Sequence, residues 1–239
     1  MLLTSFKVLS LGYHGTLIDR DTGIYTALKP LLTAARLKLD RSQAVAAFGR
    51  YESVQQAQTP DMLYRDVLAH VHQRLSREWG VLCSDDDHAL FASSLAHWPV
   101  FADAPAGLQY LRRYFKLVIV SNIDRMGFAA SSRRLGVRFE AVYTAEEIGS
   151  CKPDPRNFRH LVGGMEKLGF SRFDIVHAAA SPVRDLAPAR ACGLATAWID
   201  RQPPEPTEPA PEGANQVGFD FRLRSIADMV KAHQEELRA

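Results

Sequence analysis

The sequence predicts an α/β fold in which a parallel β-sheet is covered by helices on both faces and is interrupted by an inserted helical domain. Two observations support this prediction. From residue 99 onward, short apolar runs alternate with helix-length segments, as in consecutive strand–helix–strand units. Between about residues 21 and 91, no comparable apolar run occurs, and leucines and valines recur at helical spacing instead. We therefore expect a core made of residues 1–16 and 99–239 and a helical cap domain of residues 17–98.

The first expected strand is residues 8–11, an apolar run that ends in a glycine-rich loop. In the helical segment, Pro30 and Pro60 are expected to separate helices. In the second part of the chain we expect helices at 105–114, 126–135, 155–168 and 182–192 and strands at 117–120, 141–143, 175–179 and 195–199. A polar, proline-rich surface loop at 203–213 and a helix at 228–237 complete the chain.

The composition argues against several classes of partner. The 239 residues include 29 Lys and Arg and 27 Asp and Glu, mixed along the chain, so we expect neither nucleic-acid nor membrane binding. Cys83, Cys151 and Cys192 are odd in number and lack metal-ligand spacing, which favours a reducing compartment. No run approaches about 18 apolar residues, and the N-terminus does not follow the plan of a signal peptide. We expect a cytoplasmic protein with a small-molecule substrate. The sequence leaves open whether the protein forms a homodimer.

Polar side chains follow the predicted strands. In an open parallel sheet, ligands bind beyond the carboxyl ends of the strands, so these side chains are expected to meet. They are Gly12, Tyr13 and His14 after the first strand, Ser121 and Asn122 after the second, Lys152 in the third region, and Ser181, Arg184 and Asp185 after the fourth. A hydroxyl, an ammonium and a carboxylate that converge on one set of loops are suited to handling an anion.

Taken in order, these segments resemble the motifs of the haloacid dehalogenase superfamily. Residues 6–19 resemble its nucleophile loop, and residues 121–124 resemble the second motif, where Ser or Thr binds the transferring group. Lys152 matches the lysine that neutralises the charge of nucleophile and substrate. Residues 181–185 match the fourth motif, whose acid holds Mg²⁺ in phosphatases or orders the site in dehalogenases. The resemblance covers about residues 6–201 and implies a Rossmann-like core with a helical cap, as in the 2-haloacid dehalogenase-like branch.

Gly12 stands where this superfamily has the aspartate that attacks the substrate. A glycine has no side chain that could attack, ligate a metal or accept a proton. Losing a covalent nucleophile typically costs about 10⁴ to 10⁶ in rate. The branch also often has Gln and His at the positions of Ala180 and Arg184. We therefore expect no metal, no other cofactor and no reaction through the usual aspartyl-enzyme intermediate.

Three functions stay open from the sequence. In the first, His14, Lys152 and Asp185 catalyse elimination, isomerisation or hydration of a small polar or anionic molecule. This substrate would be bound by Gly12, Tyr13, Ser121, Asn122, Ser181 and Arg184. The second function is a catalytically silent binding or regulatory protein, and the third is an ordinary hydrolase or dehalogenase that carries an engineered Gly12. Each catalytic candidate also has a structural interpretation. His14 could bond to a backbone carbonyl, Lys152 could be a solvated surface lysine, and Asp185 could cap a helix.

Overall fold

The computed structural model describes residues 1–201 and 217–239. These residues include a six-stranded parallel sheet with the strand order β3-β2-β1-β4-β5-β6. The strands are β1 (Val8–Leu11), β2 (Lys116–Ser121), β3 (Ala141–Thr144), β4 (Ile175–Ala179), β5 (Ala195–Ile199) and β6 (Phe221–Leu223). The α/β fold with a parallel sheet, which the sequence predicted, is confirmed.

The order of the strands places a crevice at the centre of the sheet. The chain begins in the middle with β1, adds β2 and β3 on one side, and then returns to add β4, β5 and β6 on the other side. Such a reversal opens a crevice beyond the carboxyl ends of the two strands where it occurs, here β1 and β4. The loops that follow these two strands carry Gly12 and Ser181. The predicted site therefore lies at the switch point of the sheet.

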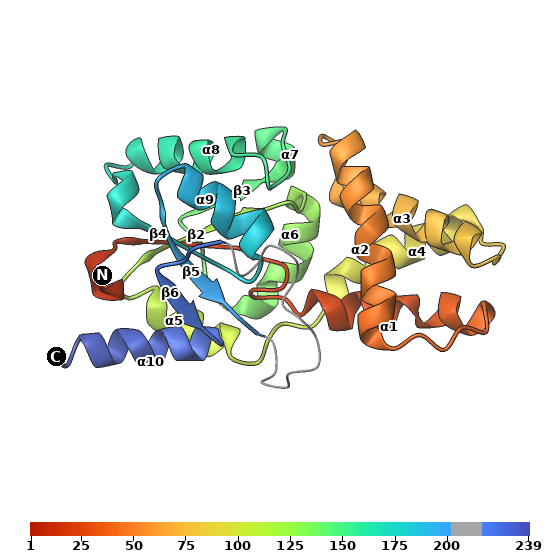
Figure 1. Ribbon diagram of the computed structural model, residues 1–239, viewed down its shortest axis with the longest axis horizontal. Coiled ribbons are helices and arrows are strands. Elements are labelled where there is room, and N and C mark those ends of the chain that lie inside the picture. Colours follow the sequence, from red (N-terminus) through yellow and green to blue (C-terminus); the bar gives the residue numbers. More distant parts are fainter. Residues whose placement is uncertain (202–216) are drawn as a thin grey trace.

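Both faces of the sheet are covered, which explains why its strands are apolar without alternation. Val8 packs in one cluster with Phe158, whereas Leu9 packs in another with Leu108. In Figure 1, α8 and α9 lie on one face of the sheet, and α5 and α10 lie on the other. The helices of the core are α5 (Ala104–Leu111), α6 (Arg125–Ser132), α7 (Ala145–Ile148), α8 (Arg156–Glu166), α9 (Ala187–Ala191) and α10 (Ile226–Glu236).

Four helices that follow β1 and precede α5 lie to one side of the sheet (Figure 1). They are α1 (Arg20–Ala34), α2 (Arg41–Gln58), α3 (Tyr64–Glu78) and α4 (Asp85–Ser93), and we call residues 20–93 the helical insert. Local signals start three of these helices. The side chain of Asp19 accepts a hydrogen bond from the Thr22 N–H, and Asp40 and Ser84 each complete a capping box. A 3₁₀ turn, η2 (Ser94–His97), leads back toward the core.

The entry to the helical insert and the exit from it run side by side. The Asp19 N–H donates to the Pro99 carbonyl over 2.8 Å, and the Phe101 N–H donates to the Leu17 carbonyl over 3.0 Å. These bonds hold the insert to the core by two adjacent segments. The division of the chain into a core of residues 1–16 and 99–239 and a cap domain of residues 17–98 stays a prediction.

The structure corrects two details of the predicted elements. Pro30 does not break a helix but lies inside α1. A proline in a helix interior costs about 3 kcal/mol, whereas each fully buried leucine contributes about 1.5–3 kcal/mol, and Leu28, Leu31 and Leu32 are all buried here. Strand β6 was not predicted, since it is only three residues long and has an exposed Arg222 at its centre.

The other predicted elements differ from the observed ones mainly at their ends. The helix predicted at 182–192 is split into a π-helical turn, η5 (Pro182–Leu186), followed by α9. The loop predicted at 203–213 lies outside the described residues. In the part of the chain that the structure describes, no helix combines the length and the apolar character needed to cross a bilayer.

Candidate functional site

A cavity of about 380 Å³ lies beyond the carboxyl ends of the central strands, between the core and the helical insert. Eight of the nine predicted site residues line it, and the ninth, Gly12, lies just behind it. The eight are Tyr13, His14, Ser121, Asn122, Lys152, Ser181, Arg184 and Asp185. The insert contributes Arg20, Glu52, Gln56 and Tyr64. The polar residues after four separate segments of the core therefore meet around one cavity.

Lys152 and Asp185 form a buried ion pair beside the switch point. The Lys152 Nζ also donates to the Val120 carbonyl over 2.8 Å. Behind the pair, the Nε2 of His177 lies 3.3 Å from the same Asp185 oxygen, and its Nδ1 lies 3.0 Å from the Ser10 hydroxyl. A chain of polar groups thus extends from the cavity into the sheet. The alternative interpretation of Lys152 as a solvated surface residue is wrong.

The electrostatics of this pair fix the charge on Asp185. Burial alone would raise the pKa of its carboxyl, but the Lys152 charge and the contact with His177 outweigh burial and lower it to about 2. Burial lowers the pKa of His177, against the opposing effect of Asp185. At neutral pH, Asp185 is therefore a carboxylate and His177 an uncharged imidazole. Asp185 lies inside the helical turn η5 and does not cap it, because the Ser181 hydroxyl accepts the Arg184 N–H at the start of this turn.

A second buried carboxylate, Glu52 on α2, lies between two arginines. It accepts hydrogen bonds from Arg20 Nη2 at 2.7 Å, from Arg184 Nη1 at 3.2 Å and from the Tyr64 hydroxyl at 2.6 Å. Burial would raise the pKa of Glu52, but the two guanidiniums and the hydroxyl outweigh it and lower the pKa to about 2. Because Arg184 belongs to the core and Glu52 to the insert, this cluster joins the two parts across the cavity.

His14 lies among aromatic rings. Its ring centroid is 5.3 Å from that of Tyr13 and 5.2 Å from those of Tyr64 and Trp98. Its buried Nε2 has no hydrogen-bond partner among the described residues. Burial, aided by the nearby Arg20 charge, lowers the pKa of His14 to about 3. The structural interpretation, a hydrogen bond to a backbone carbonyl, does not hold for this nitrogen. At neutral pH the ring is uncharged and leaves one polar atom unsatisfied, which is costly in a buried place.

Asn122 and Tyr13 make internal contacts. The Asn122 Oδ1 accepts the Lys152 N–H over 2.7 Å, and its Nδ2 donates to the Lys152 carbonyl over 3.0 Å. Asn122 therefore positions the backbone that carries the lysine. The Tyr13 hydroxyl is bonded to the Ser131 hydroxyl over 2.7 Å, and the side chain is buried.

Ser121 and Ser181 also bond to nearby backbone. The Ser121 hydroxyl accepts the Ile123 N–H over 3.3 Å, and the Ser181 hydroxyl accepts the Arg184 N–H over 3.2 Å. A hydroxyl can donate one bond and accept two, so both keep capacity toward a ligand. The substrate-binding roles of these two serines stay predictions.

At Gly12, the space in which a side chain would begin is closed. A Cβ added there would lie 2.9 Å from both the Ala179 Cβ and the Thr16 Oγ1, and 3.4 Å from Asp185 Oδ1. Thr16 cannot turn away freely, because its hydroxyl accepts the Ala180 N–H over 3.0 Å. A residue with a side chain at position 12 would therefore require its neighbours to move.

Three residues of the site, Glu52, Tyr64 and His177, were not predicted from the sequence. His177 lies inside β4, and a single polar residue in an otherwise apolar strand does not by itself indicate a site residue. Glu52 lies in the helical insert, far along the chain from every motif. One signal could have identified it: Phe48, Glu52 and Gln55 recur at helical spacing, and all three are buried. Polar residues on the apolar face of a helix indicate a polar partner or a site.

The residues of this site do not fit Mg²⁺. The ion prefers six oxygen ligands in octahedral geometry, usually with one or two carboxylates among them. Gly12 offers no side chain, and the Asp185 oxygen nearest to it already contacts Lys152 and His177. Within residues 1–201 and 217–239, no group of three or more His, Cys, Asp or Glu side chains is placed to hold a metal.

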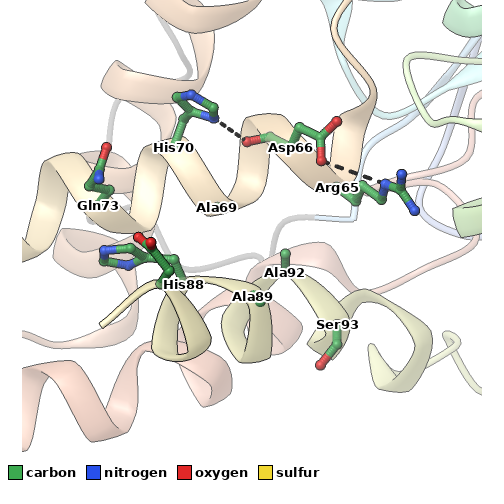
Figure 2. Close-up of a pocket in the computed structure, with 10 residues that line it drawn as sticks. Arg65, Asp66, Ala69, His70, Gln73, His88, Ala89, Ala92 and Ser93 are labelled. Atoms are coloured by element: carbon green, nitrogen blue, oxygen red, sulfur yellow. Dashed lines mark hydrogen bonds and ion pairs between the residues drawn. The ribbon is translucent and has the colours of Figure 1, made fainter. Parts of the chain in front are cut away.

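A larger concavity, about 580 Å³, lies between α3 and α4 of the helical insert (Figure 2). The contacts drawn in Figure 2 join Arg65, Asp66 and His70, which are neighbours along α3. Arg65 Nε lies 3.6 Å from Asp66 Oδ1, and His70 Nδ1 lies 2.8 Å from the Asp66 carbonyl. None of the predicted site residues lines this concavity. The smaller cavity, where buried charges converge, remains the candidate site.

Comparison with known proteins identifies the family. The family model described as haloacid dehalogenase-like hydrolase matches residues 13–193. The chain belongs to this family. Over 146 residues it is 36% identical to haloacid dehalogenase-like hydrolase domain-containing protein 3 of Bos taurus, an alignment that covers 59% of this chain and 54% of that protein. The chain thus spans about half the length of this curated relative.

Solved structures of the family share the fold. The HAD-hydrolase YfnB of Bacillus subtilis, bound to magnesium, has a TM-score of 0.76 and 16% identity, covering 96% of this chain and 99% of that one. The L-2-haloacid dehalogenase of Xanthobacter autotrophicus with covalently bound chloropropionic acid has a TM-score of 0.74 and 16% identity, over 96% and 98% of the two chains. The dehalogenase Rha0230, described as defluorinating, has a TM-score of 0.73 and 20% identity, over 100% and 98%.

Proposed function

We propose that this protein binds a small anionic organic molecule in the cavity between core and insert, without forming a covalent aspartyl intermediate. The observation that carries the proposal is the set of buried and half-buried charged side chains around the cavity. Among the described residues that line it, Arg20, Lys152 and Arg184 are cations, and Glu52 and Asp185 are carboxylates. The lining therefore has one more cation than carboxylates, and Arg20 also pairs with the exposed Asp21 outside the lining. Buried charges are costly to retain, and a ligand anion would supply the missing balance.

Two features favour binding over hydrolysis. Gly12 provides no nucleophile, and the space for a side chain at that position is closed by Ala179 and Thr16. The ionisable groups at the cavity are also poorly matched to proton transfer at neutral pH. A general base works best with a pKa near the working pH, whereas the pKa is lowered to about 2 for Glu52 and Asp185 and to about 3 for His14. This chemistry suits a binding or regulatory protein.

The helical insert would act as a cap over this ligand. Glu52 and Gln56 on α2 and Tyr64 on α3 face the cavity from the insert side. Covering the ligand excludes water, and a lower local dielectric strengthens each charge contact. Arg184, which lines the cavity and contacts both Glu52 and Ser53 on α2, would respond directly to a ligand.

The test is a ligand screen followed by calorimetry. A panel of small carboxylates, sulfonates and phosphate esters is screened by thermal shift, and each hit is titrated into wild-type protein and Arg184→Gln. We expect binding of an anionic ligand that weakens at least about tenfold in this variant, the size of a lost charge-assisted hydrogen bond. The matched control is Arg50→Gln, which removes an exposed arginine of α2 that pairs with Glu78. Equal affinities in the wild type and Arg184→Gln would contradict the proposal.

One observation favours a second function, an enzyme that uses acid–base chemistry at His14. The buried, unpartnered Nε2 of its ring is an atom to which a substrate proton could be transferred or from which one could be donated. Any turnover should then fall by about 10² to 10⁴ in His14→Ala, the size expected of a general acid or base. A substrate that is consumed equally fast by wild type and variant would exclude this role.

A further inference from the structure

Glu52 provides the cavity with an anion of its own. Its side chain is 1% exposed and accepts hydrogen bonds from Arg20, Arg184 and Tyr64. Two guanidiniums and a hydroxyl around one group of oxygens are the contacts that a bound carboxylate, sulfate or phosphate would otherwise make. In this structure the protein's own carboxylate makes them.

The charge that remains for a ligand is therefore small. The carboxylate of Asp185 is engaged by Lys152, so this pair is neutral. The guanidiniums of Arg20 and Arg184 share the carboxylate of Glu52, and Arg20 also pairs over 3.1 Å with Asp21, whose side chain is 57% exposed and does not line the cavity. Among the cavity-lining groups, one positive charge is therefore left between the two arginines. The side chain of Arg184 is 35% exposed, whereas that of Arg20 is only 15% exposed. A ligand can thus approach Arg184 most easily, but it approaches Glu52 at the same time.

We infer that Glu52 determines the charge of the ligand, so that the cavity accepts a monoanion and rejects dianions such as sulfate or a phosphate monoester. This inference rests on the proposed function in that both place the ligand at Arg184. A monoanion balances the remaining positive charge. A dianion exceeds it, and its second charge lies close to the fixed carboxylate, where two like charges at about 4 Å repel strongly in a partly buried site.

The inference makes Glu52 a specificity-determining residue. Replacing its carboxylate with the neutral amide of Gln keeps the size and an acceptor for the Tyr64 hydroxyl, but frees a second positive charge. Arg20 and Arg184 would then form a pair of donors for one dianion. Selectivity for charge should therefore reverse with this single change, while the rest of the cavity stays as it is.

The experiment is isothermal titration calorimetry of sodium acetate and sodium sulfate at constant ionic strength. Acetate represents a monoanion, and sulfate is a dianion at every pH of interest. For wild-type protein, we expect sulfate to bind at least about tenfold more weakly than acetate. In Glu52→Gln, sulfate should bind at least about tenfold more tightly than it does in wild type. The matched control is Glu78→Gln, which removes an insert carboxylate that pairs with Arg50 at the surface and should leave both affinities unchanged.

Three results would overturn the inference. The first is a folded Glu52→Gln that gains no sulfate binding. The second is wild-type protein that binds sulfate as tightly as acetate, which decides the question even if the variant does not fold. The third is wild-type protein that binds neither anion, unless Glu52→Gln gains sulfate. In that last case the role of Glu52 stands and the proposed function fails. Conversely, if wild-type protein binds acetate and Glu52→Gln gains no affinity for sulfate, the proposed function stands and the inference about Glu52 fails.

Discussion

Two buried carboxylates face the same cavity, and they are held in different ways. Asp185 pairs with a lysine whose position is fixed by the core, through the Val120 carbonyl and the side chain of Asn122. Glu52 comes from the helical insert and bridges arginines at the boundary between insert and core. The first cluster therefore depends on the sheet, and the second on how the insert lies against it. This difference suggests that the first keeps the site in shape and the second responds to the ligand.

The strongest test of this comparison is Lys152→Met. Removing the lysine leaves Asp185 buried with only the uncharged His177 beside it, and breaking a buried pair from one side costs about 3–5 kcal/mol. We expect a loss of this size in the free energy of unfolding, measured with urea at pH 7. The double variant Lys152→Met/Asp185→Asn removes both charges and should recover part of the loss. A loss below about 1 kcal/mol would show that the pair does not stabilise the site.

The corresponding change in the second cluster is Glu52→Gln, for which we expect a smaller loss of about 2–3 kcal/mol. The amide retains hydrogen-bonding capacity, and the partly exposed Arg184 can turn toward solvent. The same urea titration measures it, with Glu78→Gln as the surface control. A loss larger than that of Lys152→Met would reverse the proposed difference between the two clusters.

Substitutions at Gly12 test the first cluster, because a side chain at this position would lie next to Asp185. In Gly12→Ala the added methyl group meets Ala179 and Thr16, and overpacking of this kind costs about 1–3 kcal/mol. Gly12→Asp should be less stable than Gly12→Ala at pH 7, because it also adds a carboxylate beside Asp185. Thermal or urea unfolding of the two variants separates the steric effect from the charge effect. An Asp variant more stable than the Ala variant would show that the site still accommodates the missing carboxylate.

The smallest expected effects are in the pH dependence of stability, which compares the contributions of the two carboxylates and of His14. Glu52 and Asp185 have a lowered pKa of about 2, so their stabilisation is present above their ordinary values and is lost as the pH falls from about 5 toward 2. For His14, whose pKa falls from 6.5 to about 3, the unfolded chain binds the proton first. Its stabilisation is therefore lost earlier, as the pH falls below 6.5.

A variant of His14 isolates its contribution. Between pH 6.5 and 4.5, His14→Asn should flatten the slope of stability against pH by up to about 1.4 kcal/mol per pH unit, the effect of one proton. His70→Asn, on the exposed face of α3, is the control. An unchanged slope in His14→Asn would mean that His14 takes up its proton equally in the folded and unfolded chain.

The sheet and the core side of the site could be predicted from the sequence because both depend on local patterns. Strand β4 was predicted with its exact ends, since a buried parallel strand is a short apolar run between turn signals. The residues after the strands were predicted to meet because parallel strands end at the same edge of the sheet. Lys152 and Asp185 could thus be placed together although they are 33 residues apart.

The insert side could not be predicted in the same way. Glu52 contacts Arg184, which is 132 residues away, and no repeated geometry such as a sheet edge relates a helix of the insert to a loop of the core. The packing of α2 over the cavity decides this contact, and the helical pattern alone does not contain it. The low pKa of His14 is similarly a consequence of burial among rings from three separate segments.

The most direct test of the central claim, binding without aspartyl-enzyme chemistry, is chloride release from 2-chloropropionate. The protein is incubated with an excess of this compound, which is bound covalently in the related dehalogenase, and chloride is measured against a protein-free control. We predict no chloride above the control, because Gly12 offers no attacking oxygen. Suppose instead that the wild-type protein, which has Gly12, releases chloride continuously over many equivalents and that Lys152→Met does not. This result would contradict the claim and show that this site still carries out dehalogenation.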